Sequence, residues 1–179
     1  MAKAIFNPES NTIIVRGAKC VPGQSDLLFR NFAGRPTQFS EEGKRNFTVV
    51  LTPENAEELR ASLEASGLVL NLKPQEDGTY RFKVTVNLNG YRLPNIVRKK
   101  VGADGEVKIE DIDTDNFALV DKCLISNADF SCTPTYLSKY KQWACYLNSF
   151  MFTPLVDPIT EELEALKYAH PTDDEEDPF

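Results

Sequence analysis

One stretch of the chain, residues 79–91, alternates strictly between apolar and polar side chains. This period of two is typical of a β-strand with one buried face and one exposed face. The apolar positions are Tyr80, Phe82, Val84, Val86 and Leu88, and the polar positions are Arg81, Lys83, Thr85, Asn87 and Asn89. The pattern therefore predicts a strand whose exposed face is basic.

Other segments are rich in β-branched and aromatic residues and predict further strands. They are residues 12–15, 46–51, 105–110, 117–126 and 142–152. Glycine and proline lie between these segments, as is typical of turns. In the last segment both faces are apolar, which fits either a strand buried on both sides or an aromatic face open to a ligand.

One segment, residues 53–66, has the pattern of an amphipathic helix. Thr52 is a favourable N-cap, and Pro53 suits the first helical position. Leu59 and Leu63 are four residues apart, so they lie on one face that can pack against a sheet. The sequence therefore predicts one helix that covers the strands.

Many short strands and one helix favour a small barrel or sandwich over a parallel α/β sheet, in which helices alternate with strands. We predict a mainly β protein with an OB-type Greek-key β-barrel, although the pattern alone leaves a sandwich open. The predicted domain spans residues 1–156. Residues 157–179 are expected to form a short helix, with apolar Ile159, Leu163 and Leu166, and then a disordered acidic tail.

The charge of the chain is divided unevenly between these two parts. The whole chain carries a net charge of -7, but residues 157–179 contain nine acids and one lysine. The remainder has 19 basic and 18 acidic residues and is close to neutral. The acidic total therefore does not exclude a nucleic-acid partner, whose phosphates must be neutralised by cations.

The chain lacks the sequence features of a membrane or secreted protein. No apolar stretch approaches the roughly 20 residues of a membrane span, and the first residues lack the apolar run of a secretory signal. We therefore expect a cytoplasmic protein with no membrane partner. Cys20, Cys123, Cys132 and Cys145 are too scattered for a disulfide framework. We interpret them as small core residues, with a zinc site as the alternative.

No catalytic pattern is present. The single histidine, His170, lies beside the acidic tail, and the chain contains no phosphate-binding loop, nucleophile elbow or HExxH motif. The acids of residues 106–115 have some of the spacing of a calcium loop but lack its central Gly and distal Glu, so we prefer a solvated loop. We expect a protein that is not an enzyme and uses no cofactor or metal.

Basic and aromatic residues are interleaved in residues 29–39, 89–92 and 133–143. A protein that binds single strands needs both kinds, because cations track the phosphates and aromatic faces stack on unpaired bases. The candidate phosphate-binding residues are Arg35, Lys44, Arg45, Arg81, Lys83, Arg92, Arg98, Lys99, Lys100, Lys139 and Lys141. The candidate stacking residues are Tyr91, Tyr136, Tyr140 and Trp143.

These candidates also have purely structural interpretations. The cations of residues 79–91 are equally explained as the solvated side of a half-buried strand, and residues 98–100 as charges that protect a strand edge. Trp143 fits a core as well as a stacking platform. We expect Tyr136 and Tyr140 to lie in a projecting loop, where no strand pattern turns them inward.

Residues 27–179 resemble a known family. The segments NFAGR and GKRNF, a capped helix, the strands YRFKVTVNLN and ACYLNSFMF and a terminal acidic tail together resemble those of phage-encoded single-stranded DNA-binding proteins of OB fold. The resemblance implies a barrel that coats single-stranded DNA during phage replication and recombination, without strong sequence preference. A homo-oligomer is compatible with this interpretation.

The end of the chain is similar to the tip of bacterial single-stranded DNA-binding proteins. Its residues are Asp173, Asp174, Glu175, Glu176, Asp177, Pro178 and Phe179. We expect this tail to compete with DNA for a basic groove and to present Phe179 to replication partners such as a polymerase, helicase or primase. The alternatives are a solubilising tail, a β-rich phage assembly module that does not bind DNA, and an RNA-binding OB protein.

Overall fold

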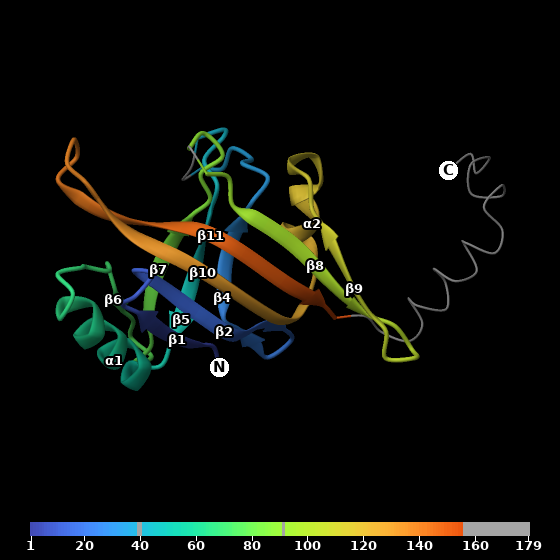
Figure 1. Ribbon diagram of the computed structural model, residues 1–179, viewed down its shortest axis with the longest axis horizontal. Helices are drawn as coiled ribbons and strands as arrows, with labels where there is room; N and C mark the ends of the chain where they lie inside the picture. The colour runs from blue at the N-terminus through green and yellow to red at the C-terminus, as the bar shows by residue number, and fades with distance from the viewer. Residues whose placement is uncertain (39–40, 91, 156–179) are drawn as a thin grey trace.

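Long strands build most of the fold. A computed structural model of the chain describes residues 1–38, 41–90 and 92–155 (Figure 1). The strands are β1 (Lys3–Asn7), β2 (Thr12–Val21), β3 (Gln24–Ser25), β4 (Leu27–Asn31), β5 (Asn46–Leu51), β6 (Lys73–Pro74), β7 (Tyr80–Thr85), β8 (Asn95–Val101), β9 (Val107–Asp111), β10 (Ile125–Leu137) and β11 (Gln142–Pro154). The helices are α1 (Pro53–Glu64) and α2 (Phe117–Lys122), and a 3-10 turn, η1 (Thr114–Asn116), precedes α2.

The strands form one mixed sheet, whose main path runs in the order β1-β2-β10-β11-β7-β5-β4. β10 and β11 form the longest antiparallel pair, from Ile125 opposite Pro154 to Leu137 opposite Gln142. β11 also runs parallel to β7 at Tyr146 and parallel to β8 further along. β9 pairs with β8 in an outer hairpin.

Asp26 links β2 to β5, so the sheet curls back on itself. The N–H of Asp26 donates to the carbonyl of Lys19 (2.8 Å), and the carbonyl of Asp26 accepts from the N–H of Val50 (2.9 Å). The buried carboxylate of Asp26 also accepts from the N–H of Lys19 (2.9 Å). This curled, mainly β architecture agrees with the predicted OB-type barrel.

Phenylalanine side chains fill the centre of the curled sheet. Phe32, Phe47 and Phe150 are fully buried, and their ring centroids lie 5.1 to 5.6 Å apart. Aromatic pairs at such distances stabilise a core beyond the burial of their surface. Phe47 is therefore a core residue.

β7 confirms the alternation predicted for residues 79–91. Phe82 and Val84 are buried, whereas Arg81 and Lys83 lie on the opposite, more exposed face. The strand itself is shorter than predicted and ends at Thr85.

The predicted helix is confirmed as α1, which lies beside β1 at the lower left of Figure 1. Thr52 is its N-cap, and the hydroxyl oxygen accepts from the N–H of Asn55 (3.3 Å). Leu59 and Leu63 are buried as predicted. The buried side chain of Asn55 donates to the carbonyl of Ala4 and accepts from its N–H, each at 2.8 Å. Asn55 thus fixes α1 to β1.

Two predictions for the segments around β10 are wrong. Residues 117–126 do not form a strand, because the chain makes α2 before it enters β10 at Ile125. A short apolar run fits a helix or a strand equally well. Tyr136 does not lie in a loop, because β10 continues through Pro134 to its end. β2 pairs with β10 only as far as Cys132, so no neighbouring strand on that side requires an N–H from the proline.

The two apolar faces of residues 142–152 result from a β-bulge. The register of the β10–β11 pair shifts after Ser131 and leaves Asn148 as an extra residue in β11. The buried side chains are Cys145 and Leu147 before the bulge, and Phe150 and Phe152 after it. Because a bulge changes which positions face inward, one strand supplies core residues from both alternating sets.

Three of the cysteines, Cys20, Cys132 and Cys145, are buried, as predicted for small core residues. All four cysteines are free thiols. Among the described residues, no helix has the length and apolar content needed to cross a membrane. The predicted C-terminal helix and acidic tail lie outside the described residues.

Candidate nucleic-acid interface

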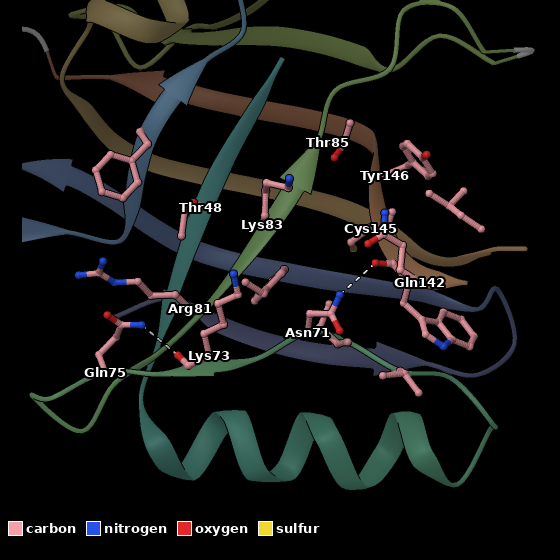
Figure 2. Close-up of a pocket in the computed structure, with 17 residues that line it drawn as sticks. Thr48, Asn71, Lys73, Gln75, Arg81, Lys83, Thr85, Gln142, Cys145 and Tyr146 are labelled. Carbon is pink, nitrogen blue, oxygen red and sulfur yellow. Dashed lines mark hydrogen bonds between the residues drawn. The ribbon is translucent and has the colours of Figure 1, made fainter. Parts of the chain in front are cut away.

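A cavity of about 580 Å³ lies on the outer face of β5 and β7, and we name it the β7 groove. β11 and the end of β10 line it on one side, and residues 69–75, which follow α1, line it on the side of that helix (Figure 2). Three of the predicted site residues, Arg81, Lys83 and Trp143, line this groove. The structure therefore brings together cations and an aromatic ring that are about 60 residues apart in the sequence.

Three cations line the β7 groove from β6 and β7. Arg81 and Lys83 are two residues apart and share the outer face of β7. Lys73 pairs in register with Arg81, which places both side chains on one face of the sheet. The Nε of Arg81 is buried and has no hydrogen-bond partner within the described part of the chain. A buried donor without a partner is costly, so this guanidinium is well suited to an anionic ligand.

Aromatic side chains of β11 lie across the groove from these cations. Tyr146 faces the groove because its neighbours Cys145 and Leu147 turn toward the core. Trp143 lies nearer the end of the hairpin, where its carbonyl accepts a hydrogen bond from the side chain of Asn71 (3.0 Å). The groove thus has one cationic wall and one aromatic wall.

Phe29 adds a third aromatic ring at the side of β4. Its side chain is 72% exposed, although it lines the groove. Its backbone has φ of 54°, a conformation that is unusual for a bulky residue. The register of β4 and β5 is irregular between Leu28 and Asn31, which indicates a bulge at this position. Bulges redirect side chains near functional sites, and this one turns an aromatic ring outward.

The predicted aromatic and basic residues of the β10–β11 hairpin extend away from the groove. Tyr136 is 50% exposed, and its ring centroid lies 5.4 Å from that of Trp143. Tyr140 is 63% exposed in the connecting turn. The ammonium group of Lys139 lies 5.5 Å from the centroid of the Tyr140 ring, and Lys141 is exposed beside it.

The NFAGR segment is a loop held by specific hydrogen bonds. The carboxylate of Asp121 accepts from the N–H groups of Phe32 (2.6 Å) and Ala33 (3.1 Å). Burial raises the pKa of Asp121, and these hydrogen bonds oppose that effect only in part. Gly34 has φ of 71°, and a Cβ there would lie 3.2 Å from the Cα of Gly43. The NFAGR segment is therefore explained by the backbone conformation of the loop and by its hydrogen bonds to Asp121.

The three basic residues predicted in and after this loop have different environments. Arg45 donates to the carbonyl of Phe32 and lies over the ring of Phe117, at 5.9 Å from its centroid. Arg35 and Lys44 have exposed side chains. Arg45 thus supports the loop, whereas the other two are open to solvent.

The remaining predicted cations do not line the groove. Arg98, Lys99 and Lys100 lie on β8. Arg98 forms an ion pair with Glu110 (2.5 Å), and its hydrogen bond holds the pKa of that carboxyl below the usual value. Arg92 is exposed. Tyr91 and the tail residues 173–179 lie outside the described residues.

Sequence reasoning did not identify Phe29, Lys73 or Tyr146 as site residues. Tyr146 belongs to a segment with two apolar faces, and only the bulge at Asn148 decides which face is open. Lys73 follows a helix and has no periodic neighbours. Phe29 lies in an interleaved basic and aromatic segment, and this composition is a signal of a binding residue.

Comparisons with known proteins identify related sequences and folds. A family model described as "Putative phage ssDNA-binding domain" matches residues 18–177. The fold is similar to the single-stranded DNA-binding protein from bacteriophage Enc34, with 9% identity, a TM-score of 0.50 and coverage of 88% of this chain and 92% of that chain. At this identity the similarity shows the fold alone.

Two further solved structures are more distant. The Enc34 protein in complex with ssDNA matches with 9% identity and a TM-score of 0.48 over 84% of this chain and 90% of that chain. The gp2.5 single-stranded DNA-binding protein encoded by bacteriophage T7 matches with 13% identity and a TM-score of 0.35 over 92% and 95% of the two chains. Comparison with curated proteins gives no match.

Proposed function

Because the chain belongs to the phage single-stranded DNA-binding domain family, we propose that it coats single-stranded DNA along the β7 groove with little dependence on base sequence. The observation that carries this proposal is the cationic wall that faces an aromatic wall across one cavity. Cations attract any phosphate and aromatic rings stack on any base, so neither wall distinguishes sequences. A binding family also agrees with our expectation that the protein is not an enzyme.

We assign separate roles to the two walls. Lys73, Arg81 and Lys83 neutralise phosphates, and the unpaired Nε of Arg81 supports a direct hydrogen bond to a phosphate oxygen. Tyr146 and Trp143 stack on bases that enter the groove. Each stacked base contributes about 1–3 kcal/mol, so a few rings give substantial affinity.

The bound strand continues along the β10–β11 hairpin in this proposal. Tyr136 and Tyr140 provide further stacking surfaces, with Lys139 and Lys141 beside them for phosphates. Arg35, Lys44 and Arg92, which are exposed, Tyr91, which lies outside the described residues, and the partly buried residues 98–100 remain candidates for contacts outside the groove. Arg45 contributes indirectly, because its hydrogen bond to Phe32 supports the loop.

The biological role is the protection of single-stranded DNA during phage replication and recombination in the host cytoplasm. The acidic tail competes with DNA for the β7 groove, since its carboxylates resemble a chain of phosphates. DNA binding then releases the tail, and Phe179 binds a polymerase, helicase or primase. The excess of acids in residues 157–179 over a nearly neutral body supports this division of roles.

Fluorescence anisotropy with a labelled oligothymidine tests the function. We expect tight binding to the single strand, much weaker binding to a duplex of the same length, and a linear fall of log affinity with log salt. A parallel titration with oligouridine measures the preference for DNA over RNA. A preference for duplex, or an affinity that salt does not change, would contradict the proposal.

A further inference from the structure

β9 lies at the outer rim of the sheet and has one unpaired edge. Within the described part of the chain it pairs only with β8 (Figure 1). The carbonyl of Glu106 and the N–H of Ile112 bond toward β8, at 2.8 and 2.9 Å. Backbone groups alternate in direction along an antiparallel strand, so those of Val107, Ile109 and Asp111 point away from β8.

This edge contains neither a proline nor a bulge, which are two of the features that prevent pairing with another strand. The register of β8 and β9 is continuous from Val97 opposite Asp111 to Val101 opposite Val107. Val107 and Ile109 are 50% and 62% exposed. Open backbone donors and acceptors therefore lie beside exposed apolar side chains, which is the surface that strand addition requires.

Charges on the other face of the β8–β9 hairpin indicate which strand fits this edge. Lys100 and Lys108 are directly opposite each other, which places two ammonium groups side by side. Glu110 lies near Arg98 and Lys100, and Lys108 forms no ion pair within the described residues. Residues 95–111 contain four cations and four acids in total, so two copies of the hairpin do not repel each other by net charge.

We propose that β9 pairs in antiparallel orientation with β9 of a second copy of this chain, with Ile109 opposite Ile109 on a two-fold axis. This register places Lys108 of each copy beside Glu110 of the other. It also pairs the outward backbone groups of Val107 with those of Asp111. The contact is isologous, so it closes as a dimer and joins two sheets into one.

Registers in which the axis moves by one residue are less favourable because of the same charges. Moving the axis by one residue places Lys108 opposite Lys108 or Glu110 opposite Glu110, and directly opposed like charges are destabilising. The sequence VKIED therefore complements itself in one antiparallel register. This self-complementarity favours a second copy of the chain over an unrelated strand.

Sedimentation equilibrium of the full chain, from micromolar to millimolar concentration, tests the dimer. In the proposed dimer, residue 108 of each copy lies beside residue 110 of the other, which gives two contacts. Lys108→Glu and Glu110→Lys each place like charges at both contacts, so each variant alone should dimerise about tenfold more weakly than the native chain. An equimolar mixture of the two variants restores opposite charges at both contacts and should dimerise like the native chain. Lys122→Glu makes the same charge change on α2 and should leave dimerisation unchanged.

Cross-linking gives a second measurement that leaves the charges of β9 intact. In a hydrogen-bonded antiparallel pair the Cα atoms lie about 5.5 Å apart, within the range of a disulfide. Ile109→Cys should therefore form a disulfide-linked dimer under mild oxidation, whereas Val101→Cys, which is similarly exposed at 51%, should not. A native chain that sediments as a monomer throughout, a mixture that associates no better than its components, or equal cross-linking of both cysteine variants would overturn the proposal.

Discussion

The rings of Tyr136 and Trp143 lie 5.4 Å apart between centroids, and their planes meet at 56°. The two residues are register partners on β10 and β11, beyond the last residue of β10 that pairs with β2. Trp143 lines the β7 groove, and Tyr136 is half exposed on the hairpin. The ring contact therefore connects the groove to the projecting hairpin.

Replacing Trp143 by leucine should weaken single-stranded DNA binding by about 1–3 kcal/mol, the contribution of one stacked base. Trp143 is the only tryptophan of the chain, so stacking of a base should also quench the fluorescence of the native protein during a titration. Leu119→Ala, at an exposed position on α2, should keep the native affinity. If the fluorescence of the native protein did not change when DNA saturates it, the DNA would not stack on Trp143.

The cations of β7 should act through counterion release. Arg81→Gln and Lys83→Gln should each reduce the slope of log affinity against log salt by about 0.7, the value for one phosphate contact on a single strand. Lys122→Gln removes an exposed cation from α2 and should leave the slope unchanged. If all three variants gave the native slope, the phosphates would not lie in the β7 groove.

Substitutions of Phe29 should affect the stability of the protein and its affinity for DNA independently. Its φ of 54° disfavours any residue with a Cβ, so Phe29→Gly should be more stable than Phe29→Ala by about 1 kcal/mol. Both variants lack the ring and should lose DNA affinity to the same extent. Urea denaturation measures the first difference and anisotropy the second. Equal stability of the two variants would show that β4 relaxes around the substituted residue.

The parts of the fold that could be predicted from the sequence are those governed by local pattern. β5 and α1 begin at the predicted residues, and Phe82 and Lys83 face opposite sides of β7 as their alternation requires. Capping, β-branching and a period of two are properties of neighbouring residues, so no distant contact is needed to interpret them.

The parts that could not be predicted depend on contacts between distant segments. Pro134 predicts the start of a loop, yet it lies within β10, because β2 no longer pairs with β10 at this position. Tyr146 becomes a groove residue only through the bulge at Asn148, which is a property of the β10–β11 pair. Arg45 looks like the other exposed cations, and only the folded position of Phe117 makes it a structural residue.

Asp121 should make the stability of the protein depend on pH. Burial raises the pKa of its carboxyl in the native state, so the native state binds the proton more tightly than the unfolded chain does. Between the two pKa values the free energy of unfolding therefore falls as the pH rises. Relative to Asp121→Asn, which does not titrate, the native chain should lose stability from about pH 4, the usual range for Asp, through the raised pKa. Urea denaturation across this pH range measures the difference in the free energy of unfolding. If this difference rose with pH, the hydrogen bonds to Asp121 would affect its pKa more than burial does.

The two roles proposed for the acidic tail should be separable by substitution. Deleting residues 173–179 should tighten single-stranded DNA binding at low salt, because a competing polyanion is removed, and the gain should disappear at high salt as both interactions are screened. Replacing the five acids of the tail by Asn and Gln, with Phe179 kept, should give the same gain. Phe179→Ala, with the acids kept, should leave DNA affinity native but weaken binding to a phage polymerase, helicase or primase in a pull-down. If deletion leaves the low-salt affinity unchanged, the tail does not compete for the β7 groove, and the partner assay then tests its remaining role independently.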